Sequence, residues 1–530
     1  MLIRSLIAFA AIFSLLSFSH AQSNVSTAEE KAYRAAVVLA ASPEKIAALD
    51  KFLAAYPKSS LRVLAHRTML ETLLEVPAEQ KDRFLAHAQQ LLAAASDSTR
   101  GNWLNLIAGM LLEKGVWLDE AERLAQESVA QLGDRKNLKQ SQQVVAGGRV
   151  AVTSNVPRLV TLGRIYLQRG KMKEAETLLK EAAAADALLV STLLGLGELA
   201  AAKGDQKTAL RYFADAYLSG RGREPARKRV EAAYRKVYPT KPEELEIWLD
   251  AKYQKDAPNP IKVEAYKPTA ARTNRVVLAE VFSGSSCAPC IATDLAVEAA
   301  LKRYSTKELA VLMYHVQIPD LDPLTNPTGE ARQDFYGARV APLVYVNGAL
   351  QRGLGGYRDK AEESWAKLTP VIDKALDAPS EAAIRISAMR QGPTIKVKLG
   401  IEKIRSNAST LRLHLALVED EVRYTGVNGI RFHPMVVRAM AGEKAAGWAV
   451  KADETPAFEH TFEVQKIEAA TKTYLDEYEL NGRALPVKFE DKKHAIDVNK
   501  LSLVAFLQDP QTKQILQAVF LKLPAADKFQ

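Results

Sequence analysis

The spacing of apolar and polar positions divides the 530-residue chain into three stretches of different character. From about Ser26 to Tyr238 the sequence is rich in Ala and Leu, and its apolar residues recur at the spacing of amphipathic helices. From Arg275 short apolar runs stand between helical segments, and from Ser380 apolar and polar residues alternate. We therefore expect a helical part, a mixed α/β part and a β part, in that order.

The helical stretch contains a repeat with a period of 34 residues. Seven positions recur at this distance, and six of them keep the same or another apolar residue. The period and its small residues resemble the tetratricopeptide repeat, in which two helices cross closely at such positions. The resemblance implies stacked helix pairs that bind a protein partner or serve only as structure. The first copy has Leu162, Gly163, Tyr166, Gly170, Ala175, Leu179 and Ala182, and the second has Leu196, Gly197, Ala200, Gly204, Ala209, Phe213 and Ala216.

The middle stretch predicts alternating strands and helices. Arg275–Phe282 is a short run of mainly apolar residues that predicts a buried strand, and helical spacing predicts a helix from Ile291. Asn347-Gly348 predicts a hairpin turn, with a further strand after it. The other expected elements are strands at Leu309–Val316 and Leu343–Val346 and helices at Glu330–Phe335 and Arg358–Leu376.

The two cysteines of the chain, Cys287 and Cys290, lie three positions apart where that helix begins. The first turn of a helix has unpaired N–H groups and the positive end of the helix dipole, which favour the thiolate form of Cys287. Cys290 lies one turn further on and can attack a mixed disulfide formed at Cys287. The pair is therefore a candidate for an attacking and a resolving thiol.

The order strand–CxxC–helix–strand–helix–X-Pro–strand–turn–strand–helix resembles the thioredoxin fold over about residues 275–378. In that family the proline before the hairpin, here Pro342, is cis and packs beside the dithiol. The resemblance implies that Ala341 offers its backbone groups to an extended substrate, and that the protein is a thiol–disulfide oxidoreductase acting on protein thiols or disulfides. The uncharged Ala288-Pro289 between the cysteines favours reduction or exchange.

Some positions depart from thioredoxin itself. Ser286 stands where thioredoxin has a tryptophan, and Val281 stands where reductases of the family often have a buried carboxylate. The adjacent Glu280 is expected to point to the opposite face of its strand. The connection from the second strand to Pro342 is also long. These departures leave the strength and direction of the redox activity open.

Other uses of the dithiol compete with exchange. A zinc site needs four ligands, and a copper site would have to use Cys287, Cys290 and His315, the one histidine of the middle stretch. A disulfide that closes so short a loop would stabilise the fold little. The main alternative is a non-catalytic scaffold in which the repeats and the thioredoxin-like part bind a protein partner. We expect no metal and no cofactor.

Alternation predicts strands in the C-terminal stretch. Leucines occupy every second position from Leu411 to Leu417, and the last apolar segment predicts a hairpin. Several antiparallel strands at this spacing predict a β-sandwich over residues 379–530. Glu419 and Asp420, at the end of a strand, are expected to be solvated.

The N-terminus has the layout of a secretory signal peptide, with Arg4, an apolar run and a small-x-small signal that ends at Ala21. Cleavage is expected before Gln22, which is not a lipid-anchor cysteine. The formal net charge of +10 is dispersed, which argues against nucleic-acid binding. We expect a periplasmic or secreted protein without stable membrane insertion. The expected division is 1–21 signal peptide, 22–250 helical repeats, 251–273 linker, 274–378 thioredoxin-like part and 379–530 β-sandwich.

Overall fold

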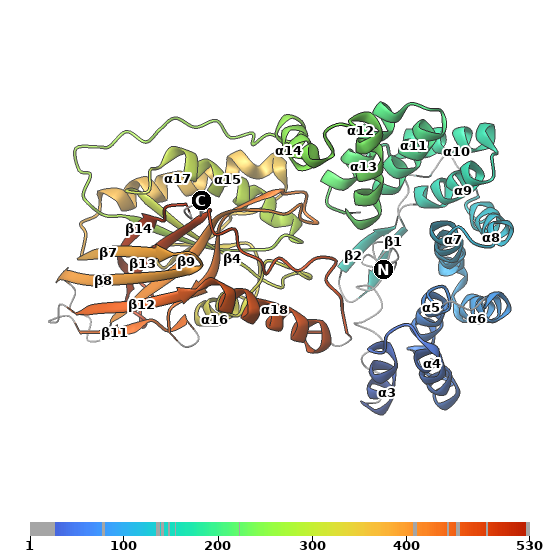
Figure 1. Ribbon diagram of the computed structural model, residues 1–530, viewed down its shortest axis with the longest axis horizontal. Coiled ribbons are helices and arrows are strands. Elements are labelled where there is room, and N and C mark those ends of the chain that lie inside the picture. Colours follow the sequence, from blue (N-terminus) through green and yellow to red (C-terminus); the bar gives the residue numbers. More distant parts are fainter. Residues whose placement is uncertain are drawn as a thin grey trace. The chain divides into compact units, whose positions relative to one another are not determined.

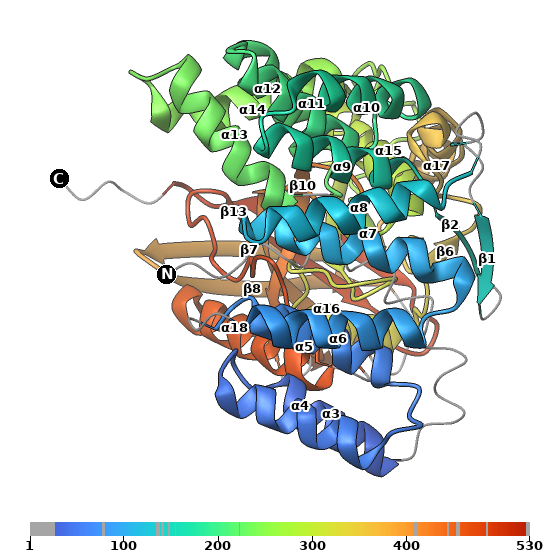
Figure 2. The same ribbon diagram turned by 90° about the vertical axis from the view of Figure 1, so that its right-hand side faces the viewer.

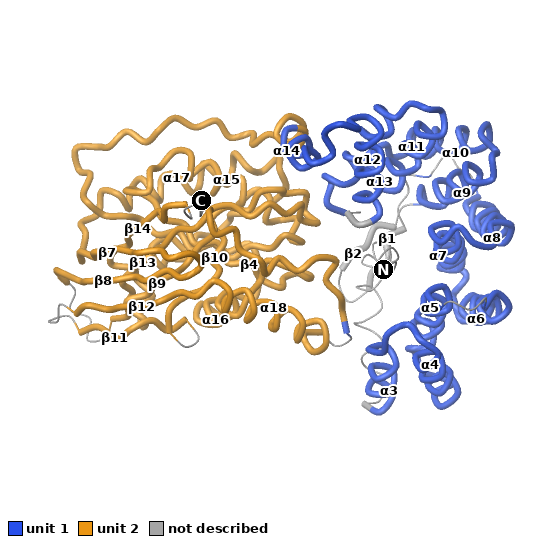
Figure 3. The backbone as a smooth tube through the Cα atoms, in the orientation of Figure 1, with its two compact units in different colours: residues 1–251, 484–486 blue, residues 252–483, 487–530 orange. Residues whose placement is uncertain are grey.

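The computed structural model forms two compact units, residues 1–251 with 484–486, and residues 252–483 with 487–530 (Figure 3). Each unit is described by itself below. The residues that the structure describes are 27–76, 80–133, 138, 142–146, 149–153, 155–221, 223–405, 411–442, 445–451, 456–483 and 486–525.

The first unit is helical, as the sequence predicts. Its helices follow one another as neighbouring pairs, which Figure 2 shows from α3 to α12. A hairpin of β1 (Gln142–Ala146) and β2 (Arg149–Thr153) interrupts them. The helices are α3 (Thr27–Val37), α4 (Pro43–Ala55), α5 (Arg62–Leu73), α6 (Lys81–Ala94), α7 (Asp97–Lys114), α8 (Leu118–Ala130), α9 (Val156–Gln168), α10 (Met172–Ala185), α11 (Val190–Ala202), α12 (Gln206–Leu218), α13 (Arg223–Val237), the 3-10 turn η2 (Pro242–Glu244) and α14 (Leu245–Asp256).

Close helix contacts explain the small residues of the 34-residue period. A side chain added at Gly163 on α9 would meet Leu179 of α10 at 3.0 Å, and one added at Gly197 would meet Phe213 of α12 at 2.4 Å. These two contacts are the same contact shifted by one period. Gly170 has a φ of +74° in the turn between α9 and α10, which only glycine adopts readily. The close helix crossing expected at the small residues is therefore found between α9 and α10 and again between α11 and α12.

A row of alternating charges links helices α7, α9, α11 and α13 of this unit. Arg164 on α9 reaches Glu113 of α7 and Glu198 of α11, each at 2.7 Å. Arg229 on α13 reaches the same two carboxylates at 3.2 and 2.8 Å. All four side chains are largely shielded from water, so each charge needs an oppositely charged partner within the row. The row therefore fixes the helices in register and leaves little free charge there.

Two histidines lie buried between α5 and α6. His66 Nδ1 is 3.1 Å from His87 Nδ1, so one ring donates a hydrogen bond and the other accepts it. Burial, His87 and Arg62 lower the pKa of His66 from 6.5 to about 4. Burial also lowers the pKa of His87. Both rings are therefore uncharged in the folded protein near neutral pH.

Acid is expected to weaken this packing. Because the pKa of His66 is lowered in the folded state, the unfolded chain binds more protons below pH 6.5. The free energy of unfolding is therefore highest above pH 6.5 and decreases as the pH falls towards about 4. For His66 the loss is about 2 kcal/mol. Urea unfolding of the wild type and of His66→Gln, at about pH 7.5 and about pH 4.5, checks this. The variant should lose less stability between the two pH values, and equal losses would contradict the interpretation.

The second unit is built on a mixed sheet with the strand order β14-β13-β9-β10-β4-β3-β5-β6, and β11 pairs with β9. Helices α15 and α17 lie on one side of this sheet and α16 and α18 on the other (Figure 1). Its first half comprises β3 (Val277–Ser283), the 3-10 turn η3 (Ala288–Cys290), α15 (Ile291–Arg303), β4 (Leu309–His315), α16 (Pro327–Tyr336), β5 (Leu343–Val346), β6 (Ala349–Gln351), the 3-10 turn η4 (Arg358–Lys360) and α17 (Ala361–Asp377).

The C-terminal strands extend this same sheet. β10 pairs with β4, with Val436 beside Met313, so the expected boundary between residues 378 and 379 falls inside one compact unit. A separate three-stranded sheet, β12-β8-β7, packs its apolar face against the leucines of β9 and β13. The elements are β7 (Ala382–Gln391), β8 (Thr394–Ile404), β9 (Leu411–Arg423), β10 (Phe432–Met440), β11 (Trp448–Val450), β12 (Ala457–Glu463), α18 (Val464–Asn481), β13 (Leu501–Gln508) and β14 (Ile515–Lys522).

Two expectations for this stretch were wrong. Alternation predicted strands alone, but α18 is a helix of 18 residues. Glu419 was expected in water, but it is 4% exposed and pairs with Arg438 at 2.9 Å. The reason is that β9 is an interior strand flanked by β10 and β13, so the end that looked like a free strand terminus is covered.

A buried ionic cluster connects the two halves of the second unit. Glu280 of β3 accepts hydrogen bonds from Arg332 of α16 at 2.7 Å and from the hydroxyls of Tyr314 and Tyr336. Gln508 of β13 accepts from the same guanidinium at 3.1 Å. Glu280 is fully buried and Arg332 is 2% exposed. As expected from strand alternation, the Glu280 side chain bonds Arg332 of α16, which lies on the opposite side of the sheet from α15 (Figure 1).

Candidate functional site

The two cysteines lie where β3 gives way to a helix. β3 ends at Ser283, a short polar turn follows, and Cys287 caps the 3-10 turn η3 that leads into α15. Cys287 and Cys290 are joined by a disulfide, with their Cα atoms 5.3 Å apart. The predicted strand, turn and helix around them are confirmed. Both residues are almost completely buried, with Cys287 1% exposed.

The second predicted part of the site lies beside the first. The Ala341–Pro342 peptide bond is cis, and the Ala341 carbonyl oxygen lies 3.7 Å from Cys287 Sγ although the residues are 54 positions apart. Pro342 also touches a glycine loop, because a side chain added at Gly355 would meet Pro342 Cγ at 2.9 Å. The structure therefore brings all four predicted residues, Cys287, Cys290, Ala341 and Pro342, together.

A glycine loop before α17, residues 353–356, also belongs to the site and was not predicted from the sequence. Gly356 donates its N–H to the Pro289 carbonyl at 2.7 Å and accepts from the N–H of Ala292 at 3.0 Å. Gly355 has a φ of +117°, and a side chain there would also meet Pro289 O at 3.2 Å. The glycine pair thus allows backbone to lie directly against the dithiol helix. The signal was present in the sequence as the run GLGG at residues 353–356.

A buried carboxyl group lies one helical turn beyond Cys290. Asp294 of α15 is 6% exposed and accepts a hydrogen bond from the Ser283 hydroxyl at 2.7 Å. Burial raises the pKa of Asp294 from 3.8 to about 7, against the lowering effects of Ser283 and His315. Asp294 therefore changes its charge close to neutral pH, near the cysteines. A buried carboxyl group is thus present on α15, although Val281 of β3 is apolar.

The long segment after β4 supplies a second buried polar group. Asp322 accepts hydrogen bonds from His315 Nδ1 at 2.8 Å and from the N–H of Ser285 at 2.6 Å. Burial opposes ionisation, but His315 and the backbone N–H groups lower the pKa of Asp322 below its ordinary value. Burial and His315 lower the pKa of His433, whose ring packs against that of His315, to about 3. Asp322 thus fixes both His315 and the turn that carries Cys287.

His315, the third residue of the possible copper site, is the last residue of β4. Its Nδ1 is used by Asp322, and both sulfurs are in the disulfide. Within the described ranges, no group of three or more His, Cys, Asp or Glu side chains is arranged to hold a metal ion.

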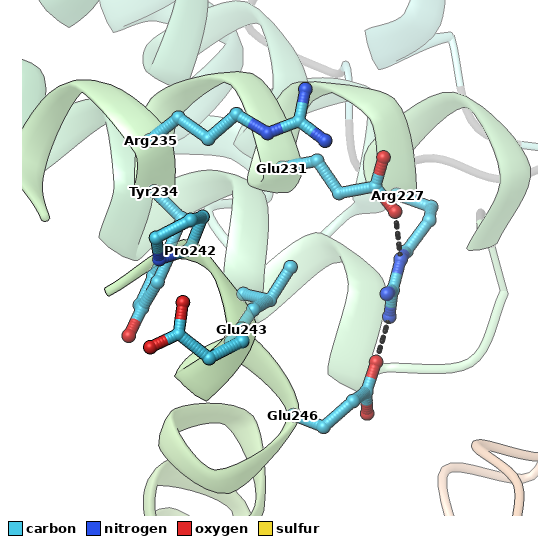
Figure 4. A pocket seen from close by; sticks show the side chains of 8 residues that line it. Arg227, Glu231, Tyr234, Arg235, Pro242, Glu243 and Glu246 are labelled. Atoms are coloured by element: carbon cyan, nitrogen blue, oxygen red, sulfur yellow. Dashed lines mark hydrogen bonds and ion pairs between the residues drawn. The ribbon is translucent and has the colours of Figure 1, made fainter. Parts of the chain in front are cut away.

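A pocket of about 210 Å³ lies in the helical unit, between α13 and α14. Figure 4 shows Arg227 there between Glu231 and Glu246, to which it is ion-paired. The single positive charge of Arg227 therefore offsets only one of these two carboxylate charges. The full lining is Arg227, Glu231, Tyr234, Arg235, Pro242, Glu243, Leu245 and Glu246.

The predicted cleavage site, Ala21 and Gln22, lies outside the described residues. In the part of the chain that is described, no helix has the length and apolar character needed to cross a membrane.

Comparisons with known proteins give few matches. No family model matches the chain, and no curated protein does either. Among solved structures, HBP35 of Porphyromonas gingivalis is similar at 14% sequence identity, over 50% of this chain and 80% of that chain, with a TM-score of 0.34. A likeness of this degree decides neither the fold nor the function.

Proposed function

We propose that the protein is a thiol–disulfide oxidoreductase of the reductase or exchange type that acts on protein disulfides. The observation that carries the proposal is the disulfide between Cys287 and Cys290 at the start of a helix, beside the Ala341 backbone. A dithiol in this position forms its thiolate readily, and a neighbouring backbone edge can hold an extended partner. The proposal places the mature chain, beginning at Gln22, in the periplasm or outside the cell.

The element order supports a thioredoxin-like identity for residues 274–378. β3 pairs with β4 in parallel and with β5 antiparallel, the crossover between β3 and β4 is α15, and α17 follows the β5–β6 hairpin. The helical unit fits tetratricopeptide-like repeats, because the Gly163–Leu179 contact recurs as Gly197–Phe213. In this proposal the repeats bind or position the partner protein.

An apolar rim around the dithiol favours polypeptide partners. Val340, Tyr357 and Val427 are 60%, 61% and 40% exposed. Each adjoins a residue that contacts the dithiol segment. Val340 precedes Ala341, Tyr357 follows Gly356, and Val427 precedes Asn428, which bonds the Cys287 carbonyl. Large exposed apolar side chains grouped from three loops are typical of a binding surface.

The proposed reaction is a two-electron exchange. The Cys287 thiolate attacks one sulfur of a partner disulfide, the partner S–S bond breaks, and one partner thiolate leaves and takes up a proton. Cys290, as thiolate, then attacks Cys287 Sγ and releases the second partner thiolate, which also takes up a proton. The partner gains two electrons and the Cys287–Cys290 pair becomes the disulfide seen here. An external dithiol donor must reduce that disulfide before the next cycle.

One observation favours a second candidate, a non-catalytic scaffold. Cys287 is 1% exposed, so in the disulfide form its sulfur is covered. In a scaffold, the apolar rim and the repeats would bind a partner without any bond exchange. Exchange, in contrast, requires the segments that cover Cys287 to move.

Insulin reduction with dithiothreitol as donor separates the two candidates. The wild type should accelerate reduction, and Cys287→Ser should abolish the acceleration because the attacking sulfur is missing. In a separate incubation without dithiothreitol, reduced Cys290→Ser should capture insulin as a mixed disulfide through Cys287, visible on a non-reducing gel. Equal rates for the wild type and both variants would establish the scaffold and end the redox proposal.

A further inference from the structure

A turn from the C-terminal part of the chain contacts the dithiol segment. This turn, residues 424–431, joins β9 to β10 and is closed by backbone hydrogen bonds from Tyr424 N–H to Arg431 O and from Gly426 N–H to Ile430 O. It lies outside the region that resembles thioredoxin, and its sequence alone predicts no role for it. Asn428 stands near its tip.

Asn428 holds three carbonyl groups of the dithiol segment. Its backbone N–H donates to Ser285 O at 2.9 Å. Its side-chain Nδ2 donates to Gly284 O at 3.2 Å and to Cys287 O at 3.4 Å. The side-chain oxygen accepts from the Ile430 N–H at 3.0 Å, which orients the amide. A single residue therefore bonds both ends of the turn that carries Cys287.

The fit between the two turns is tight. A side chain added at Gly426 would meet Ser285 O at 2.6 Å and Ser285 Cβ at 3.0 Å. Ser285 is also held from its other side, because its N–H donates to Asp322 at 2.6 Å. The segment before Cys287 is thus clamped between Asp322 and the turn of Asn428.

This clamp bears on the reactivity of Cys287. A thiolate is stabilised at a helix start only while the free N–H groups there keep their orientation towards the sulfur. The carbonyls of Gly284 and Cys287 also accept the N–H groups of Cys287 and Cys290, at 3.0 and 3.1 Å, so they set the geometry of that first turn. Holding these carbonyls therefore holds the backbone of this first turn, which carries the Cys287 side chain.

We propose that Asn428 is a positioning residue of the dithiol, which keeps the Gly284–Cys287 turn in the conformation that stabilises the Cys287 thiolate. The inference rests on the proposed exchange function for its purpose. With Asn428, a residue of the C-terminal stretch joins a dithiol site otherwise built from residues 283–356. The pairing of the C-terminal strands with this sheet thereby has a role at the dithiol. The titratable groups around the turn are Asp294 of α15, His315 of β4, Asp322 before α16 and His433 of β10, and the test leaves them unchanged.

The test measures alkylation of Cys287 by iodoacetamide against pH, in full-length mature protein with Cys290→Ser, where Cys287 is the only thiol. Asn428→Ala should raise the midpoint of the pH profile by about half a unit or more, a loss of about threefold in thiolate at neutral pH. Gly426→Ala should shift the midpoint in the same direction, because the new methyl group pushes the turn away from Ser285 while Asn428 stays intact.

Ile430→Val is the matched control, since it lies in the same turn, is 4% exposed and keeps the backbone N–H that donates to Asn428 Oδ1. Its midpoint should equal that of the parent protein. Circular dichroism selects variants that keep the native fold. If both Asn428→Ala and Gly426→Ala titrate like Ile430→Val, the positioning role is refuted. Since alkylation needs no disulfide substrate, failure in the insulin assay would refute the proposed function and leave this result unaffected.

Discussion

Replacing Arg332 by methionine is expected to lower the free energy of unfolding of the second unit by about 3–5 kcal/mol. The guanidinium pairs with the fully buried carboxylate of Glu280, and its removal leaves that charge without a partner. The hydroxyls of Tyr314 and Tyr336 still donate to Glu280, but they carry no compensating charge. Urea unfolding followed by far-UV circular dichroism measures the loss.

Two further variants make this expectation specific. Arg339→Met removes an ion pair with Asp334 at 3.0 Å whose side chains are 71% and 68% exposed, and it should cost less than about 1 kcal/mol. Adding Glu280→Gln to Arg332→Met removes the stranded charge and keeps an acceptor for the tyrosines, so it should restore about 1–2 kcal/mol. Equal losses in Arg332→Met and Arg339→Met would show that the buried pair is not the source of the effect.

Local patterns predicted elements well where burial is strong. The strand expected at Arg275–Phe282 is found at Val277–Ser283, and the helix expected from Ile291 begins there. Helix α18 was missed because, of its 18 residues, only Val464, Thr471 and Leu475 are buried, so its apolar stripe is thin. The pairing of β10 with β4 was missed because alternation shows that a strand has a buried face and not which strand lies beside it.

The candidate site likewise contains residues that could be predicted from the sequence and residues that could not. Cys287 and Cys290 were found because a thiol pair at the start of a predicted helix is informative by itself, whereas Pro342 was found through the resemblance to the thioredoxin fold. Asn428 and Asp322 were not, because a polar residue in a loop usually indicates only a turn. Their roles depend on contacts between positions far apart in the sequence. Asn428 bonds Cys287, 141 positions away, and Asp322 bonds Ser285, 37 positions away. Asp294 was missed because nothing in the helix sequence shows that its position faces the core.

Replacing Asp294 by asparagine is expected to stabilise the protein at alkaline pH. The pKa of this carboxyl is about 7 in the folded state and 3.8 in the unfolded state, so the folded chain binds the extra proton. That contribution is fully present below pH 3.8 and is lost as the pH rises through about 7. The gain from Asp294→Asn should therefore grow from less than about 1 kcal/mol near pH 4 to about 3–4 kcal/mol near pH 8.

Thermal and urea unfolding of the disulfide form at both pH values measures this gain. Asparagine keeps an oxygen for the Ser283 hydroxyl, so the comparison isolates the charge. Asp334→Asn, whose side chain is 68% exposed, should change stability by less than about half a kcal/mol at either pH. A gain independent of pH would mean that Asp294 ionises in the folded state as readily as in the unfolded chain. A gain that rises with pH would mean that the wild type keeps a costly ionisable group one turn from Cys290, as expected where proton transfer at a thiol is needed near neutral pH.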